Sequence, residues 1–187
     1  MVRMLDIARA LEMVNRNVRK RNVVYHMLAV EAVMRGVAGF FGDDVEKWAL
    51  VGLLHDIDYE KTETTPEKHG LLSEEMLKGA VSEETIRAIK THNAAYTGVQ
   101  PESRMEKALI ASDAVSGLLV ACALVMPSKK LVDVKIESVI KKFKDKDFAR
   151  GADRTRIMVC EEIGIPRDKF LEMALEGLKV SASQIGL

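Results

Sequence analysis

Apolar residues recur at steps of three and four along most of this chain, which is the spacing of amphipathic helices. The clearest stripe runs from Val18 to about Phe41 and contains Val23, His26, Met27, Val30, Val33, Met34 and Val37. Similar patterns predict further helices, at residues 5–14, from the turn at 42–44 to residue 54, from residue 66, at 82–92, at 105–126, along 136–143, and in two C-terminal stretches ending near 163 and 185. With no strand pair, repeat or linker in the pattern, we predict an all-α, single-domain helical bundle over residues 1–187.

Composition and charge are those of a globular protein. The 187 residues are 48% apolar and 30% charged, and this length suits one domain with a sizeable core. The formal net charge is zero and the pI is about 6.9, so no global field attracts nucleic acid or an anionic membrane. Cys122 and Cys160 form no metal motif, and charges at Asp6, Arg9 and Glu12 argue against a signal peptide. We therefore expect a cytoplasmic protein with buried, reduced thiols.

The longest apolar stretch, from Ala108 to Met126, is roughly long enough to span a bilayer. It carries Asp113 in its interior, together with small residues such as Ser116 and Gly117, which suits the central helix of a bundle better. A carboxylate in so apolar a helix is costly unless something pairs with it. Asp113 is therefore a candidate ligand or catalytic group, and no membrane partner is expected.

The segment from Lys129 to Arg150 carries many lysines over an apolar stripe at Ile136, Val139, Ile140 and Phe143. This pattern is typical of an amphipathic helix with a solvated lysine face. Alternatively, its cations face a phosphate-bearing substrate, and the candidate substrate-binding residues are then Lys129, Lys130 and Arg150. The segment lacks interleaved aromatic residues and contains balancing carboxylates, so no nucleic-acid partner is expected.

An adjacent histidine and aspartate, His55-Asp56, end the apolar run that begins at Val51. Burying both groups is costly without a partner, and a divalent metal is an economical one because imidazole and carboxylate are standard ligands. The other histidines also lie beside apolar residues, and side chains from helices that share a core can converge. The candidate metal ligands are His26, His55, Asp56, His69, His92 and Asp113.

Six candidate ligands exceed what one catalytic metal requires, because such a site keeps a position for water. They suit two metals about 3.5–4 Å apart, with Asp56 as the natural bridge between two histidine-rich sites. His69 follows Thr65-Pro66-Glu67, whose residues are typical of a helix start. Because a helix N-terminus disfavours imidazolium, we expect His69 to be biased towards the neutral form that a metal needs.

This order of ligands resembles the HD superfamily of metal-dependent phosphohydrolases, and His69 and His92 match the additional histidines of its binuclear members. The resemblance covers residues 18–118 or so. The remainder, about 128–187, forms a C-terminal helical extension similar to a family of predicted HD hydrolases of bacteria and archaea. The resemblance implies hydrolysis of a phosphate ester or anhydride of a nucleotide-like molecule, with Asp56 as a catalytic residue. The implied cofactor is one or two divalent transition metals: iron, manganese, nickel, cobalt or zinc.

The chain departs from the common pattern of His-Asp-Ile-Gly followed by lysine. Asp58 replaces the glycine, and Lys61 lies two residues later than usual. Lys61 is the candidate catalytic cation and Asp58 either perturbs the site or binds substrate; alternatively, both lie in an exposed polar loop at 58–65. The glycine-tyrosine-proline signature of cyclic-di-GMP phosphodiesterases is absent after His92, which argues against that substrate.

The symmetric dinucleoside polyphosphate hydrolases are a plausible comparison for such an enzyme, because they have a similar ligand order in a chain of similar size. Two other interpretations stay open. One is a di-iron oxygenase, because a few HD proteins use the same ligands to activate oxygen. The other is a non-catalytic, metal-containing protein that binds a ligand or a partner, although a structural metal does not need six ligands. Amphipathic helices at both ends of the chain also allow a homodimer.

Overall fold

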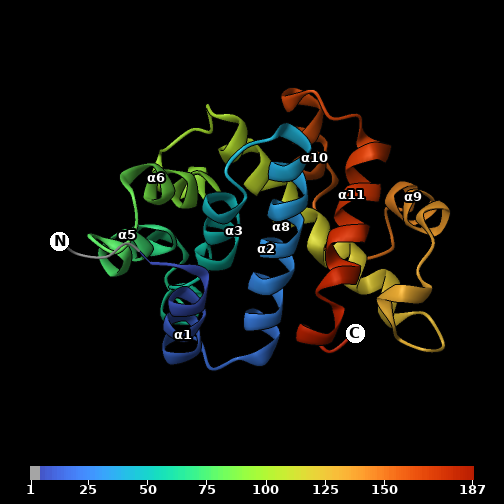
Figure 1. Ribbon diagram of the computed structural model, residues 1–187, viewed down its shortest axis with the longest axis horizontal. Coiled ribbons are helices and arrows are strands. Elements are labelled where there is room, and N and C mark those ends of the chain that lie inside the picture. The colour runs from blue at the N-terminus through green and yellow to red at the C-terminus, as the bar shows by residue number, and fades with distance from the viewer. Residues whose placement is uncertain (1–4) are drawn as a thin grey trace.

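The computed structural model describes residues 5–187, which contain helices and no strand (Figure 1). The helices are α1 (Ile7–Asn17), α2 (Arg21–Phe41), α3 (Val45–Leu54), α4 (Tyr59–Thr62), α5 (Leu71–Leu77), α6 (Glu83–Thr91), α7 (Ala94–Thr97), α8 (Arg104–Leu124), α9 (Ile136–Lys144), α10 (Arg154–Ile157) and α11 (Arg167–Val180). Short 3-10 turns are η1 (Pro66–Lys68), η2 (Leu131–Asp133), η3 (Met158–Ile163) and η4 (Ala182–Gln184). The predicted all-α fold is therefore confirmed.

Helix α2 is the centre of the packing. It contacts α3 most extensively, then α11 and α8, and Figure 1 shows it between α3 and α11. One cluster of buried apolar side chains joins these helices, with members such as Val14 on α1, Met34 on α2, Leu53 on α3, Leu118 on α8 and Phe170 on α11. The apolar stripe of residues 18–41 is thus the surface on which the neighbouring helices pack.

Two glycines allow helices to approach the backbone of α2 closely. A Cβ added to Gly52 of α3 would lie 2.9 Å from the backbone of Glu31, and one added to Gly177 of α11 would lie 2.9 Å from the carbonyl oxygen of Ala32. Any larger side chain would push these helices apart. Because His55 and Asp56 directly follow α3, the contact at Gly52 sets their position relative to α2.

Polar side chains cap the starts of three helices in the core. Asp44 accepts a hydrogen bond from the Lys47 N–H at 3.0 Å at the start of α3, and Ser82 caps α6. Ser103 and Glu106 form a reciprocal capping box at the start of α8. These capping interactions fix where α3, α6 and α8 begin, and these helices carry or precede candidate ligands.

The structure differs from the sequence-based prediction in two connecting segments. In residues 58–65, Asp58 is fully buried and α4 follows it, so Asp58 does not lie in an exposed loop, whereas Lys61 is exposed as the alternative interpretation expected. The predicted helix start at Thr65 gives only the 3-10 turn η1, and His69 lies at its C-terminal end. The neighbouring side chains of Ile57 and Leu77 are buried and hold this segment against the core. The polar sequence of the segment itself does not indicate this packing.

Helices α2 and α8 are both long and apolar enough to cross a membrane by length and composition alone. Within the protein, however, 61% and 67% of their apolar windows are buried. Such burial is characteristic of core helices. Cys122 and Cys160 are buried thiols, and burial raises the pKa of Cys122 to about 11.

Gly52→Ala tests the close contact between α2 and α3. The added methyl group meets the backbone around Glu31, so we expect a loss of about 1–3 kcal/mol of unfolding free energy. Gly39→Ala is the matched control in α2, because a Cβ there meets nothing within 4 Å and alanine favours a helix. Urea unfolding of both variants measures the difference. Equal stability of the two variants would contradict this account of the packing.

Candidate metal centre

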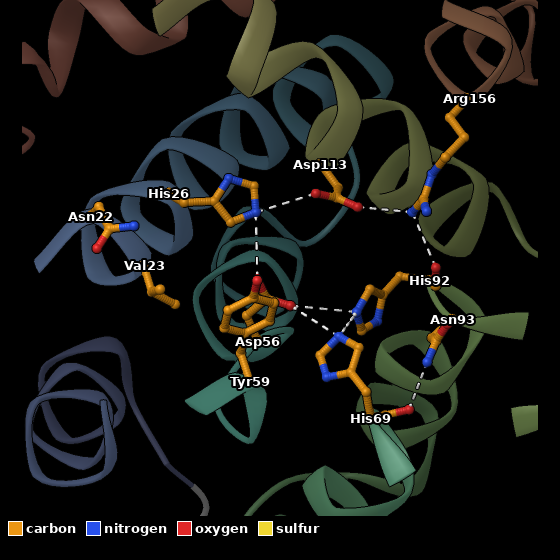
Figure 2. Close-up of a pocket in the computed structure, with 10 residues that line it drawn as sticks. All are labelled: Asn22, Val23, His26, Asp56, Tyr59, His69, His92, Asn93, Asp113 and Arg156. Atoms are coloured by element: carbon orange, nitrogen blue, oxygen red, sulfur yellow. Dashed lines mark hydrogen bonds and ion pairs between the residues drawn. The ribbon is translucent and has the colours of Figure 1, made fainter. Parts of the chain in front are cut away.

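The six candidate ligands come from five segments and converge at one site (Figure 2). His26 lies on α2 and Asp113 on α8, whereas His55-Asp56, His69 and His92 follow the ends of α3, η1 and α6. Five of the six line a cavity of about 380 Å³, and His55 is fully buried beside it. Residues up to 87 positions apart in the chain thus meet at one point, as the sequence predicted.

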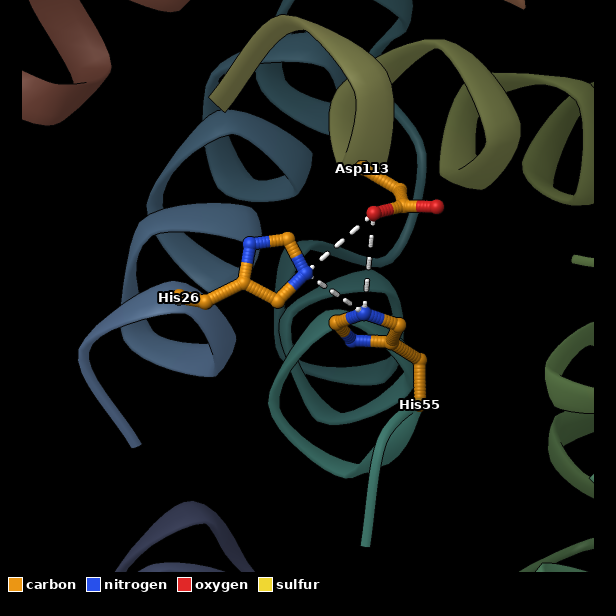
Figure 3. A group of neighbouring side chains, drawn as sticks. All are labelled: His26, His55 and Asp113. Atoms are coloured by element: carbon orange, nitrogen blue, oxygen red, sulfur yellow. Dashed lines mark hydrogen bonds and ion pairs between the residues drawn. The ribbon is translucent and has the colours of Figure 1, made fainter. Parts of the chain in front are cut away.

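The first group of ligands is His26, His55 and Asp113 (Figure 3). The Nε2 atoms of His26 and His55 are 3.1 Å apart. The Oδ1 atom of Asp113 lies 3.2 Å from Nε2 of His26 and 3.9 Å from Nε2 of His55. The two shorter separations lie within the roughly 2.9–3.4 Å between donor atoms that share one ion at 2.0–2.1 Å, and the third is about 0.5 Å longer.

The second group is Asp56, His69 and His92. The Nε2 atoms of His69 and His92 are 2.8 Å apart. The Oδ1 atom of Asp56 lies 3.2 Å from Nε2 of His69 and 3.5 Å from Nε2 of His92. This group repeats the composition of the first: two imidazoles and one carboxylate.

Asp56 contacts both groups at once. While its Oδ1 atom faces His69 and His92, its Oδ2 atom lies 3.6 Å from Nε2 of His26 and 3.5 Å from Nε2 of His55. One carboxylate therefore presents one oxygen to each histidine pair. With this placement, Asp56 could serve as a ligand to both groups.

Each histidine is oriented by a hydrogen bond at its other nitrogen. Nδ1 of His55 donates to the Gly52 carbonyl oxygen at 2.8 Å, and Nδ1 of His92 donates to the Ile89 carbonyl oxygen. Nδ1 of His26 lies 3.0 Å from the Ser116 hydroxyl, and Nδ1 of His69 lies 2.9 Å from Oδ1 of Asp58. Metal-binding histidines characteristically have such partners, which fix the ring and the position of its proton.

These partners aim the lone pairs of the Nε2 atoms at the centre of the site. With Nδ1 protonated and both paired Nε2 atoms unprotonated, two lone pairs face each other at 3.1 Å and at 2.8 Å. Two acceptors at such distances repel each other unless a proton or a cation lies between them. In the metal-free protein a proton on His69 fills one of these gaps, and a transition-metal ion can replace it, so each group offers two imidazoles and one carboxylate that fit such an ion.

Charges in the site keep both carboxylates ionised. Burial by itself would raise the pKa of Asp56, but His55, His69 and His92 hold it well below its usual value. The pKa of Asp113 is likewise lowered by His26 and His55 against the effect of burial. Burial lowers the pKa of His55 to about 4, so this imidazole is neutral at pH 7. Ionised carboxylates and neutral imidazole are the forms that bind metals.

The expectation that His69 is neutral was wrong for the metal-free protein. Burial alone would lower its pKa, but hydrogen bonds to Asp56 and Asp58 raise it to about 9. The single 3-10 turn before His69 gives no helix N-terminus to oppose these two carboxylates. A metal therefore has to displace a proton from His69.

Asp58 has a specific place in the site. Its carboxylate is fully buried and accepts hydrogen bonds from the backbone N–H groups of Gly70 at 2.8 Å and Ser73 at 2.9 Å, in addition to its contact with His69. Gly70 has a φ of 86°, a conformation that glycine adopts without strain. Asp58 therefore does not lie in an exposed loop; it positions His69.

Arg156 of α10 is a residue of the site that was not predicted from the sequence. Its Nη2 donates to Oδ2 of Asp113 at 2.8 Å and to the His92 carbonyl oxygen at 3.0 Å, and its Nε is buried without a hydrogen-bond partner among the described residues. The apolar pattern around it indicated only core packing. Asn22, Tyr59 and Asn93 also line the cavity, and only Asn22, four residues before His26 on the same helix, carried a signal in its spacing.

The structure does not bring the other predicted cations to the cavity. Lys61 donates from Nζ to Oδ1 of Asn17 at 2.9 Å, because it lies about 200° around α4 from Tyr59, which lines the cavity. Lys129 and Lys130 are exposed, and Arg150 pairs with exposed Asp147 at 2.7 Å. In this region the apolar side chains Val139 and Phe143 pack inward, so the charges face solvent.

Metal content tests the two ligand groups. We expect about two transition-metal ions per chain in protein purified without chelator, and one in His69→Gln or His92→Gln, because each variant removes a ligand from the second group only. Asp56→Asn weakens both groups and should lose most of both ions. Elemental analysis, with circular dichroism to verify folding, gives the answer. Unchanged metal content in all three variants would rule out this ligand assignment.

The pH dependence of metal binding tests the role of Asp58. Because His69 keeps its proton up to a pKa of about 9, the apparent affinity for Mn²⁺ should rise by up to about tenfold per pH unit from pH 6.5 to 8.5. Asp58→Asn removes one of the two carboxylates that raise this pKa, so the slope should flatten. At pH 8.5 the affinity of this variant should be about 10- to 100-fold weaker than that of the native protein.

The measurement is a chelator competition titration, with Asp147→Asn as an exposed control. An Asp58→Asn slope equal to that of the native protein would contradict the coupling between Asp58 and His69.

Comparison with known proteins agrees with this site. A family model described as HD domain matches residues 23–117, slightly more than half of the chain. The match begins three residues before His26 and ends four residues after Asp113, so it contains all six ligands, whereas Arg156 lies outside it. Neither curated proteins nor solved structures gave a match. The chain belongs to the HD domain family, a superfamily of metal-dependent hydrolases.

Proposed function

We propose that this protein is a metal-dependent phosphohydrolase that cleaves a phosphate ester or anhydride of a small, nucleotide-like molecule. The observation that carries the proposal is the position of Asp56, with one carboxylate oxygen toward each pair of histidines. A shared carboxylate between two metal positions is the arrangement that suits in-line displacement at phosphorus.

The residues of the chain hold the reactive groups in place. Two bound divalent ions would supply Lewis acidity, lowering the pKa of water towards neutrality and neutralising charge on the phosphoryl oxygens. Asp56 is ionised at neutral pH because its histidine neighbours lower its pKa, so it can bridge both positions. Ser116 and Asp58 keep His26 and His69 in the required orientation.

Arg156 is the cation nearest to the substrate in this proposal. It lines the cavity, and its side chain is 36% exposed although Nη2 is bound to Asp113. Its remaining donors can bind phosphoryl oxygens, which guanidinium groups recognise well. Arg156 therefore takes the role that the sequence analysis had assigned to Lys61, Lys129, Lys130 and Arg150.

The open cavity favours catalysis over a purely structural metal. Structural sites are closed by four protein ligands, whereas the second group here has three, and the site opens to a cavity of about 380 Å³. The side chains of Asp56 and Asp113 are 11% and 21% exposed, so a substrate can reach the centre. The size of the cavity lies at the low end of the range for small-molecule sites.

Phosphate release by metal-loaded protein tests the proposal. Protein loaded with manganese, iron, nickel or cobalt is incubated with nucleoside mono-, di- and triphosphates and with dinucleoside polyphosphates, under air and under argon. We expect phosphate release that does not need oxygen. Asp56→Asn should lower kcat/KM by a factor of about 100 or more, because it removes the shared ligand.

Arg156→Met should lower kcat/KM by about 10- to 1,000-fold, because it removes a cation from the transition-state charge, and Arg150→Met is the matched control at an exposed arginine. Metal-loaded protein that hydrolyses no phosphate ester or anhydride in the panel would contradict the proposal and favour a binding protein. A reaction that needs oxygen and reduced iron would favour an oxygenase.

A further inference from the structure

A second cavity of about 300 Å³ lies directly beside the metal centre. Its lining is almost wholly apolar and comes from α2, α8 and the C-terminal segment, with Tyr25, Gly117, Val120, Leu124 and Ile185 among its residues. It shares two residues, Asn22 and His26, with the cavity of the metal centre. The two cavities therefore adjoin each other at Asn22 and His26.

The second cavity exists because α8 has a glycine, Gly117, where a larger side chain would fill the space. Gly117, Val120 and Leu124 follow one another at steps of three and four on α8, so they lie on one face of that helix. A Cβ added to Gly117 meets nothing within 4 Å, so no neighbouring side chain occupies the space above it. The volume reaches the lower limit of small-molecule cavities.

The cavity of the metal centre is lined by polar and charged residues, whereas the adjoining second cavity is apolar. Figure 2 shows Arg156 and Asn93 on one side of the metal centre and Asn22 and His26 on the other. A substrate phosphate bound at the metal centre would therefore have the guanidinium group of Arg156 on one side. The apolar second cavity, next to His26, would lie on the other side. A molecule with a phosphate at one end and an apolar group at the other matches this order.

We infer that the second cavity binds the flat aromatic ring of the phosphate ester that the metal centre cleaves. This inference rests on the proposed function and names its substrate class: phosphate esters of ring-bearing alcohols, among them nucleoside monophosphates. The faces of an aromatic ring suit the aliphatic walls and the Tyr25 ring. Arg21 donates to the Tyr25 hydroxyl at 2.8 Å, and the side chain of Asn22 makes no hydrogen bond to the described residues, so its amide can bind a polar ring edge.

Binding of phosphonates, which are not hydrolysed, tests the subsite separately from catalysis. Calorimetry on Mn²⁺-loaded protein compares methylphosphonate, which is too small to reach past His26, with naphthylmethylphosphonate. We expect the naphthyl compound to bind at least about tenfold more tightly, because its ring loses contact with water. Gly117→Leu fills the cavity and should reduce this affinity ratio to near one, with metal content measured in parallel.

Leu124→Ala is a second variant that spares the core, because Leu124 is 51% exposed. It should lower the ratio about three- to tenfold, whereas Val125→Ala, at an adjacent residue outside the cavity, should leave it unchanged. Equal affinity for both phosphonates, or an equal effect of the Leu124 and Val125 variants, would overturn the inference.

Catalysis can fail independently of the subsite. Selective binding of the naphthyl compound without hydrolysis of any ester would keep the subsite and reject the phosphohydrolase. Hydrolysis without selectivity for the ring would do the reverse. Dimerisation that Leu124→Asp abolishes, together with equal affinity for both phosphonates, would show that a second copy of the chain covers this cavity instead.

Discussion

The ionised carboxylate of Asp56, buried among four imidazoles, is the interaction on which the site depends. Desolvation opposes its charge, and only the surrounding histidines, with or without metals, keep the pKa low. Those histidines have to arrive from separate segments within a few tenths of an ångström. The close contact of Gly52 with the backbone of α2 provides this precision, since α3 ends directly at His55.

Hydrogen bonds to the Nδ1 atoms of the four histidines hold their rings in the orientation that the site needs. Two of the four imidazole anchors are carbonyl oxygens of the preceding helix turns, at Gly52 and Ile89, so the helix ends themselves orient His55 and His92. His26 and His69 instead rely on the side chains of Ser116 and Asp58. Asp58 thus explains the departure from the usual His-Asp-Ile-Gly pattern: a carboxylate there holds the histidine of the second group.

The segment beyond the HD match contributes to the site as well. Arg156 reaches Asp113 from α10, and Ile185 helps to form the apolar cavity beside His26. The matched residues 23–117 therefore supply the ligands, while later residues supply charge and shape around them. In the proposed function these later residues bind the substrate, which is how one metal site can serve different substrates in different chains.

The sequence by itself determined the all-α fold and singled out the six candidate ligands, because helical periodicity and ionisable residues within apolar runs are local properties of the chain. It did not determine which cations accompany them. Lys61 and Arg150 carry the same charge as Arg156, but the direction of a side chain depends on how its helix packs. The protonation of His69 was also beyond the sequence, because it depends on Asp58, whose burial only the tertiary structure decided.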